Sequence, residues 1–391
     1  MSTGVYESCL MKVAIVHDWL TGLRGGERCL EEFIRLYPEA KVYTLLHVPG
    51  ATSNLIDSHV VQTSFLQKLP GVKNYYRWLL PFFPFAIRSL KVKNCDLVIS
   101  LSHAAAKNVR VPAGAKHICF CFTPMRYIWD QMASYFGVLR FALYPIISLL
   151  RVWDQRGAAG VTKFVAISRF VAARIRLFYG RKAAIVYPPV GDYWLAEGSE
   201  NTVTKKDFYL YAGALVPYKN VEEIIVAFNQ LNLPLVIAGD GPLKEKLSDM
   251  ANSNIEFLGR VSDEHLKALY SECKALLFAA KEDFGLIPIE CLGQGSPVIA
   301  PYCGALKESL KNIKYWSEHA HLSVKSAKAA NTGVFYRYDT KSLAEEIKRG
   351  VEFFEQKGLE FHPEDCKSHA GSFSVENFRV AWKEVVESSA S

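Results

Sequence analysis

The fold is decided by one stretch of the chain, ALLFAAKEDFGLIPIE at residues 275–290. Its first four residues are apolar and predict a short buried strand. Pro288 is tolerated only in the first turn of a helix, so we expect a helix to begin near Gly285 or Leu286. A strand, a short loop and a helix together form the repeating unit of a parallel α/β sheet.

The same order of elements recurs along two halves of the chain. In the first half, strands are predicted at 12–17, 42–46, 97–101, 117–122 and 164–167, and helices at 26–37 and 169–179. In the second half, strands are predicted at 208–212, 235–238, 255–258, 275–278 and 298–300, and helices at 221–231, 242–250, 263–271, 286–294 and 342–356. This alternation predicts an α/β protein of two doubly wound, Rossmann-like domains that face each other across a cleft.

A stiff, turn-rich hinge, YPPVG at 187–191, separates the two halves and is followed by a polar stretch. A chain of 391 residues also exceeds the ~250–300 residues at which a single core stops growing. We therefore predict a first domain at 11–190 and a second at 200–372. Residues 373–391 are expected to add a last helix that packs back on the first domain.

Composition excludes several classes of protein. An apolar content of 50% with 22% charged residues argues against disorder. No run of ~18 apolar residues is present to span a bilayer, and the first ten residues carry no export signal. The nine cysteines are odd in number and form no C-x-x-C pair, which favours a reducing, cytoplasmic setting.

The charge is unevenly distributed. Residues 61–190 contain 19 Lys and Arg against 3 Asp and Glu, a balance of +16, whereas the rest of the chain carries −9. Within this basic segment, YYRWLLPFFPF at 75–85 interleaves aromatic and basic residues, as suits an anionic lipid surface. A core element with solvated basic residues around it is the alternative, and Pro81 and Pro84 exclude one continuous helix. Nucleic acid is disfavoured, because no recognition motif accompanies the charge.

Three strand exits carry the candidate chemistry. The first, TGLRGG at 21–26, contains Gly25 and Gly26, and such glycines let a ligand approach the amides at a helix start. It is not a G-x-G-x-x-G fingerprint, so a nicotinamide cofactor is not expected. The second exit, AGALVPYKN at 212–220, places Lys219 near a helix start, where an anion would be attracted. A tight turn and an ordinary surface lysine are the alternatives for these two exits.

The third exit holds two acidic residues. Glu282 is expected in the loop at 279–284, and Glu290 one turn inside the next helix. Eight residues apart, the two side chains cannot form one helical face, so we expect them to bracket a ligand over the helix start. Carboxylates beside an anion are unfavourable unless they accept hydrogen bonds from hydroxyl groups, and sugar hydroxyls are the obvious donors.

These motifs resemble those of a known family. Residues 282–290 fit the E-x7-E element of retaining GT-B glycosyltransferases, and the chain is similar to glycosyltransferase family 4 over nearly its whole length. Further matches lie at 215–219, 236–243 and 257–263. Two more segments, 17–28 and 123–130, resemble the branch that contains mannosyltransferases of bacterial surface-polysaccharide assembly.

The resemblance implies a role for each candidate residue. Glu290 would hold the ribose of a nucleotide, Glu282 a hydroxyl of the donor sugar, and Lys219 the diphosphate. The remaining donor contacts would come from the amides of the helix start, from residues flanking the base and from two glycines of the opposite domain: Phe284, Gly285, Leu286, Ile287, Arg260, Val261, Gly25 and Gly26. The first domain would then take the acceptor and the second the nucleotide sugar.

Two departures from the family pattern concern this site. Ala214 stands where family members commonly have an Arg, so one phosphate contact is missing or comes from Arg24 or Arg260. Phe122 stands where a His often precedes the Thr-Pro step. His103, which follows the predicted strand at 97–101, is then the next polar candidate beside the acceptor, with a buried structural histidine as the alternative.

The resemblance thus implies a metal-independent retaining hexosyltransferase without a resident cofactor. Its donor would be GDP-mannose and its acceptor a lipid-linked saccharide, in the cytoplasm at the inner face of the cell membrane. Nothing like an Asp-x-Asp triad for Mg²⁺ is present in the sequence. A UDP-sugar donor and a catalytically weak nucleotide-binding scaffold are the alternatives, and the sequence does not specify the acceptor, the linkage or the oligomeric state.

Overall fold

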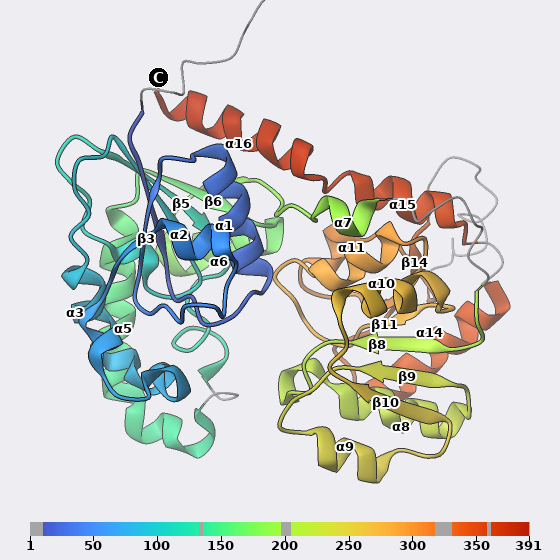
Figure 1. Cartoon of the computed structure of the whole chain (residues 1–391). Helices are drawn as coiled ribbons and strands as arrows, with labels where there is room; N and C mark the ends of the chain where they lie inside the picture. Colours follow the sequence, from blue (N-terminus) through green and yellow to red (C-terminus); the bar gives the residue numbers. More distant parts are fainter. Residues whose placement is uncertain (1–10, 133–135, 197–204, 317–330, 358–360, 391) are drawn as a thin grey trace, which may run out of the picture. The chain divides into compact units, whose positions relative to one another are not determined.

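The structure is a computed structural model that describes residues 11–132, 136–196, 205–316, 331–357 and 361–390. The chain divides into two compact units. Unit 1 comprises Met1–Tyr187 and Arg379–Ser391, and unit 2 comprises Pro188–Phe378. Each unit contains one parallel sheet with its own helices (Figure 1).

The sheet of unit 1 has the strand order β3-β2-β1-β4-β5-β6-β7. Its strands are β1 Val13–His17, β2 Lys41–Thr44, β3 Val60–Thr63, β4 Leu97–Ser102, β5 Lys116–Cys121, β6 Lys163–Ala166 and β7 Ala183–Ile185. The central strands β1 and β4 are buried along their whole length, because helices cover both faces of a parallel sheet. The five strands predicted for this half are confirmed, whereas both edge strands, β3 and β7, were missed because they are short and partly exposed.

The main helices of unit 1 are α1 Gly25–Leu36, α2 Asn54–His59, α3 Phe83–Ser89, α5 Arg140–Ala159 and α6 Arg169–Tyr179. Short 3₁₀ turns stand at η2 Phe65–Lys68, η3 Val72–Asn74, η4 Tyr76–Phe82, η5 Ala106–Asn108 and η6 Gly137–Leu139. The predicted break at 75–85 is confirmed: η4 contains Pro81, and α3 begins afresh with Pro84 in its first turn. The twenty-residue α5 was not predicted, because its apolar residues do not keep to one face.

The sheet of unit 2 has the order β10-β9-β8-β11-β12-β14-β13. Its strands are β8 Tyr209–Ala212, β9 Leu235–Ala238, β10 Ile255–Gly259, β11 Leu276–Leu277, β12 Val298–Pro301, β13 Ile313–Lys314 and β14 Gly333–Tyr336. Its helical elements are α7 Asp192–Leu195, η7 Pro217–Lys219, α8 Val221–Leu231, α9 Lys244–Met250, α10 Asp263–Glu272, α11 Leu286–Gly293, α12 Leu306–Ser309, α14 Leu343–Lys357 and α15 Pro363–Gly371. The predicted elements are confirmed to within one or two residues at each end, and the strands β13 and β14 were missed.

Both sheets therefore show the doubly wound topology that the sequence predicted. In each unit the first strand is central, and the chain builds the sheet first on one side of it and then on the other. The reversal falls between β1 and β4 in unit 1, and between β8 and β11 in unit 2.

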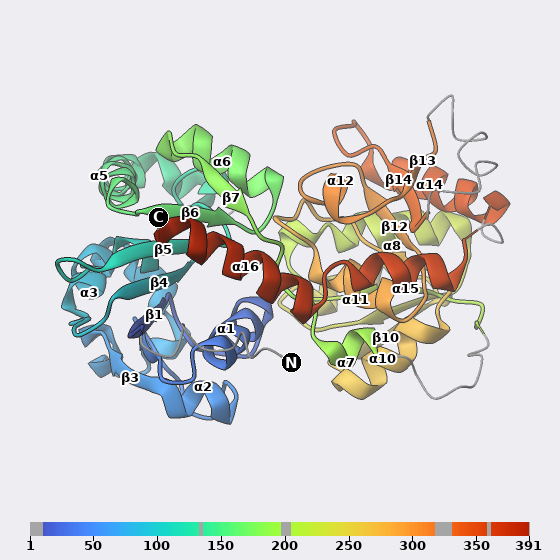
Figure 2. The same cartoon turned by 90° about the horizontal axis from the view of Figure 1, so that it is seen from above.

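The last helix, α16 Val375–Ala390, begins in unit 2, and from Arg379 onward it belongs to unit 1 (Figure 2). Trp382 is fully buried, and its ring meets that of Phe33 on α1 edge to face, with 4.7 Å between the ring centroids. The indole Nε1 donates a hydrogen bond to the Tyr37 hydroxyl at 3.0 Å, and Arg379 contacts Glu32 at 2.9 Å. These contacts hold the C-terminal turns of α16 against α1.

Within the part of the chain that the structure describes, no helix is both long and apolar enough to cross a membrane.

Candidate functional site

In an open α/β sheet, ligands bind at the carboxyl ends of the strands, where the strand order reverses. In unit 2 this point lies between β8 and β11, so the loops that follow these two strands are the candidate site. Lys219 lies in the first loop and Glu282 in the second. The fold therefore brings together two residues that are 63 positions apart.

Lys219 and Glu282 form a direct ion pair. The Lys219 Nζ donates a hydrogen bond to the Glu282 Oε1 at 2.5 Å, and both side chains are mostly buried. The ammonium group also lies 5.2 Å from the centre of the Phe278 ring. A charged pair at this depth is shielded from water, so its charges act more strongly on a bound ligand than surface charges would.

The neighbouring residue Asn220 connects the two loops. It adopts a left-handed conformation with φ of +54°, which ends η7 and allows α8 to start at Val221. Its side-chain amide donates a hydrogen bond to the Ala279 carbonyl, in the loop after β11, at 2.8 Å. Asn220 was not among the predicted site residues, although Asn is the residue type that most readily adopts this conformation after Gly.

Glycine allows close backbone packing behind Lys219. A Cβ on Gly239 would lie 1.8 Å from the carbonyl oxygen of Gly213, so the loops after β8 and β9 touch backbone to backbone. The amide of Gly213 donates to the Ala238 carbonyl at 3.0 Å, which fixes the start of the same loop. The loop that carries Lys219 is thus held from beneath.

The loop after β11 is held equally firmly. The Glu282 carbonyl accepts a hydrogen bond from the Ala305 amide at 2.9 Å. Gly304, with φ of +56°, permits this approach, because a Cβ there would lie 2.5 Å from the Glu282 carbonyl oxygen. Phe284 is buried, and its carbonyl accepts a hydrogen bond from Ser309 at 3.0 Å.

Helix α11 begins at Leu286, as Pro288 required, with Gly285 as its N-cap at φ of +90°. The first amides of a helix lack partners within the helix and carry partial positive charge. Ile287 lies next to the loop after β8, since its Cδ1 is 3.7 Å from where a Cβ on Gly213 would stand. The start of α11 and the loop that carries Lys219 are therefore neighbours.

Glu290 has a different neighbour from Glu282. It lies within α11, beside the buried Tyr270 of α10. Burial raises the pKa of the Tyr270 hydroxyl well above its ordinary value, and the nearby Glu290 carboxylate raises it further. The sequence gave no indication of Tyr270, because a tyrosine in an amphipathic helix is indistinguishable from an ordinary core residue.

Arg260 and Val261 directly follow β10. This strand is separated from β8 by β9, so both residues lie at the same sheet edge as Lys219 but two strands away. Arg260 is exposed and Val261 is half-buried. The two loops are connected through β9, because the Gly239 amide donates to the Gly259 carbonyl at 2.8 Å.

In unit 1 the corresponding reversal lies between β1 and β4. Asp18 follows β1 and is completely buried. Its two carboxylate oxygens accept hydrogen bonds from four consecutive backbone amides, those of residues 103–106, at 2.5–2.8 Å. The sequence analysis missed Asp18, although its position directly after the first strand was a signal that could have identified it.

Asp18 also orients the predicted His103. The His103 Nδ1 lies 3.2 Å from the Asp18 Oδ2, and because a carboxylate can only accept, Nδ1 carries the proton. The Nε2 of neutral His103 is then a proton acceptor. Burial lowers the pKa of His103, although Asp18 opposes this shift, and 24% of the side chain remains exposed. His103 is thus a hydrogen-bonded, incompletely buried histidine, which combines features of both sequence interpretations.

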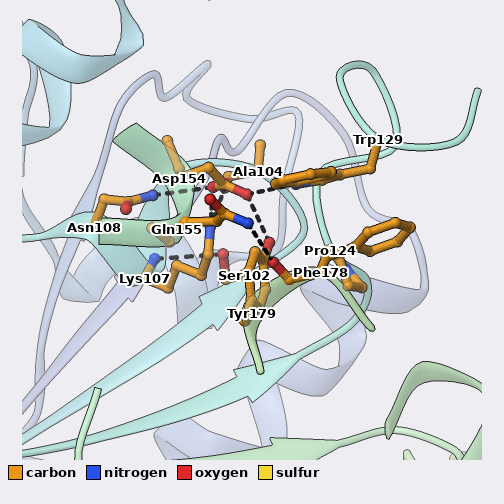
Figure 3. Close-up of polar contacts among 12 residues, drawn as sticks. Ser102, Ala104, Lys107, Asn108, Pro124, Trp129, Asp154, Gln155, Phe178 and Tyr179 are labelled. Carbon is orange, nitrogen blue, oxygen red and sulfur yellow. Dashed lines mark hydrogen bonds and ion pairs between the residues drawn. The ribbon is translucent and has the colours of Figure 1, made fainter. Parts of the chain in front are cut away.

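The turn that follows His103 is anchored a second time by a buried network (Figure 3). Lys107 of η5 pairs with Asp154 of α5, and both side chains are almost without exposure. Asp154 also accepts hydrogen bonds from the Trp129 Nε1 at 2.8 Å and from the Tyr179 hydroxyl at 2.7 Å. Because protein donors surround this carboxylate, we interpret the network as structural.

Gly25 and Gly26 are the first residues of α1, whose N-cap is Arg24. The Glu27 side chain accepts from the Arg24 amide at 3.0 Å. A Cβ on Gly26 would lie 3.6 Å from the Phe122 ring and 3.7 Å from the His17 Nε2, so this helix start adjoins a cluster of buried rings. Burial lowers the pKa of His17 to about 4.

Metal binding has no counterpart in the described ranges, where no group of three or more His, Cys, Asp or Glu side chains could hold an ion.

Residues 193–351 match the family model for "Glycosyl transferases group 1". The serotype-specific mannosyltransferase WbdA of Escherichia coli is 25% identical over 257 residues, which cover 57% of this chain and 31% of WbdA. A GDP-mannose-dependent alpha-(1-6)-phosphatidylinositol dimannoside mannosyltransferase of Mycobacterium tuberculosis is 42% identical over 77 residues, 19% of this chain and 20% of that protein. The chain spans less than half the length of the curated relatives it matches.

Among solved structures, Anabaena HepE in complex with UDP superposes with a TM-score of 0.67. The match covers 97% of this chain and 100% of HepE at 16% sequence identity. At this identity the likeness concerns the fold, and it confirms the predicted GT-B architecture.

Proposed function

This chain belongs to the group 1 glycosyltransferases, and we propose that it is a retaining hexosyltransferase that moves mannose from GDP-mannose to a lipid-linked saccharide. One observation carries the proposal. The Lys219–Glu282 pair stands beside the start of α11, at the point where the strand order of unit 2 reverses. This arrangement combines positive charge for a leaving diphosphate with a carboxylate that can accept hydrogen bonds from sugar hydroxyls.

In the proposed reaction, Lys219 and the amides of residues 284–287 hold the diphosphate. Fixed donors of this kind stabilise the negative charge that develops as the leaving group departs, and one such donor typically contributes ~3–4 kcal/mol. Glu282 binds a hydroxyl of the donor sugar, and Glu290 binds the ribose. Arg260 and Val261 flank the base, and no metal ion takes part.

The acceptor hydroxyl attacks the sugar on the face from which the diphosphate leaves, and a phosphate oxygen takes the proton. This geometry retains the configuration at the anomeric carbon without a protein nucleophile. Gly25 and Gly26 are proposed to contact the donor, and His103 the acceptor. The ion pair with Asp18 supports the role of His103, because it fixes the protonated nitrogen and the ring orientation.

The choice of mannose is supported by the printed activities of the two relatives, both mannosyltransferases, one of them GDP-mannose-dependent. A UDP-sugar is the second candidate donor, favoured by the UDP bound in the structure with the same fold. We further propose that the enzyme works in the cytoplasm on the inner face of the cell membrane. The basic segment at 61–190 supports this location, since Trp78, Phe82 and Phe85 are exposed within it.

The exposed aromatic residues belong to an element that is only partly core. Tyr76, Leu80 and Phe83 of the same segment are buried. The two interpretations of residues 75–85 are thus each correct for a different set of side chains.

The test is to incubate the purified protein with GDP-mannose and, separately, with a panel of UDP-sugars, and to measure release of GDP or UDP. We expect GDP release that is lost in Glu282→Ala and in Lys219→Ala while the thermal unfolding of both variants stays cooperative. UDP release alone would replace the donor. Release of neither nucleotide, with intact binding of GDP or UDP, would favour the nucleotide-binding scaffold that Ala214 and Phe122 suggest.

A further inference from the structure

The outer face of α5 is apolar where a surface helix is normally charged. The inner face is defined by Ile147, Leu150, Asp154 and Ala158, at the spacing of one helical stripe. On the opposite side, Phe141 is 71% exposed and Leu149 73% exposed. Exposed side chains on the outer and lateral faces of the first four turns, together with the preceding turn η6, are Val138, Leu139, Phe141, Tyr144, Ile146, Leu149 and Val152.

Single exposed apolar residues are normal, but seven within fifteen residues form a contiguous patch. A helix that is apolar all round is usually buried on all sides. Here the inner side is covered by the core of unit 1, and the outer side is exposed in the described chain. The outer face therefore needs an apolar partner of its own.

The surrounding charge indicates which partner this is. Residues 131–153 contain no Asp or Glu, and they contain Arg140 and Arg151. The Arg140 guanidinium lies 4.8 Å from the centre of the Phe141 ring, at the edge of the patch. Apolar and aromatic side chains bordered by arginine, without carboxylates, match the boundary between lipid headgroups and acyl chains.

A second exposed strip belongs to the same part of unit 1. Trp78, Phe82 and Phe85 on η4 and α3 are exposed, and the buried residues of these elements share one core cluster with Ile147 and Leu150 of α5. Figures 1 and 2 both show α3 and α5 on the same flank of unit 1. Residues 61–95, which contain this strip, also carry no acidic residue.

We propose that the outer face of α5, from Val138 to Val152, inserts into the interfacial layer of an anionic bilayer and docks the protein there. This inference rests on the proposed function only in that a lipid-linked acceptor gives the docking its purpose. It names a specific surface, separate from the donor site at Lys219. It requires no spanning segment, because an interfacial helix lies in the plane of the membrane.

The first experiment is flotation with vesicles made of equal parts phosphatidylcholine and phosphatidylglycerol, compared with phosphatidylcholine alone. We expect the wild-type protein to bind the anionic vesicles, more weakly at high salt. Phe141→Ser combined with Leu149→Ser should lower the partition coefficient by about a hundredfold, because two large apolar side chains no longer insert. Leu177→Ser is the matched control, since Leu177 on α6 is 74% exposed but outside the patch, and it should bind like the wild type.

A second variant protects the test against a folding defect. Phe141→Trp keeps an aromatic residue, and vesicles with brominated acyl chains should quench the added indole. Failure of the wild type to float, unchanged flotation of the double serine variant, equal loss in Leu177→Ser, or no added quenching would each overturn the proposal. A wild-type dimer that becomes monomeric in the double variant, without vesicle binding, would assign the patch to a second copy instead.

The outcome is distinguishable from failure of the proposed function. Release of GDP from GDP-mannose, measured without vesicles, should be the same in the double serine variant as in the wild type. Vesicle binding without GDP release would leave the docking surface in place and remove the enzymatic proposal, and the reverse result would do the opposite.

Discussion

The most direct test of the donor site is the replacement Lys219→Met, examined alone and together with Glu282→Gln. Lys219 Nζ is 2.5 Å from Glu282 Oε1, so a loss of activity in Lys219→Met has two explanations. The lysine can act on the leaving diphosphate itself, or it can merely hold Glu282 in place. Methionine retains most of the volume and removes the charge, and glutamine retains the hydrogen-bonding shape of Glu282.

The two explanations differ in the expected energies. If Lys219 stabilises the departing diphosphate, the loss is ~3–4 kcal/mol, a fall in kcat of about 10²- to 10³-fold. This loss should persist when Glu282 is already glutamine, because it does not depend on the carboxylate. If Lys219 only positions Glu282, its removal costs the ~1.5–3 kcal/mol of a charge-assisted hydrogen bond. In that case the double variant should be no slower than Glu282→Gln alone.

The assay is GDP release from GDP-mannose, with kcat and KM determined separately for the wild type, both single variants and the double variant. Equal losses in kcat and in kcat/KM would indicate an interaction made in the transition state. Lys246→Met is the matched control, since Lys246 forms a comparable pair with Glu222 at 2.6 Å on the exposed surface of the same unit. Full coupling between the Lys219 and Glu282 substitutions, or a Lys219→Met variant within threefold of the wild type, would refute the leaving-group role.

Three further predictions concern stability and nucleotide binding. Lys107→Met should destabilise the protein by ~3–5 kcal/mol in urea unfolding, because it leaves the buried Asp154 carboxylate without its cation, and Lys107→Met with Asp154→Asn should recover part of this loss. Burial lowers the pKa of His117 from 6.5 to about 4, so the unfolded chain binds a proton here that the folded protein does not, and stability should fall by about 2 kcal/mol on going from neutral pH to pH 5. His117→Gln should flatten this part of the pH profile, and an unchanged slope between pH 4.5 and 6.5 would contradict the assignment. Tyr270→Phe should weaken GDP binding in calorimetry by about tenfold, because Glu290 loses the hydroxyl beside it, whereas equal affinity would exclude a positioning role for Tyr270.

The helix-bearing part of the donor site was predictable from sequence. Pro288 alone determines that α11 starts at Leu286, since proline is excluded from later turns, and this places Glu282 in the loop. The central strands were predictable for a related reason: strands buried on both faces are continuous apolar runs. The edge strands β3 and β7 lack such runs, because one side of an edge strand is not covered by a neighbour.

The remaining features depended on contacts between residues that are distant in the chain. The Lys219–Glu282 pair, the seat of Glu290 beside Tyr270 and the hold of Asp18 on the turn at His103 arise only when the sheets assemble. Each needs the carboxyl ends of particular strands to come together, and a periodicity or a motif contains no information about that distance.

The sequence by itself therefore determined the two parallel sheets, the start of α11 and the residue types available at the strand ends, because these follow from local rules on burial and backbone geometry. Only the tertiary structure decided which of those residues meet and which apolar side chains remain outside. Residues 75–85 illustrate the difference: their aromatic character is visible in the sequence, but packing alone buries Phe83 and leaves Phe85 exposed. The physical reason is that burial depends on what covers a side chain, and that partner lies elsewhere in the chain.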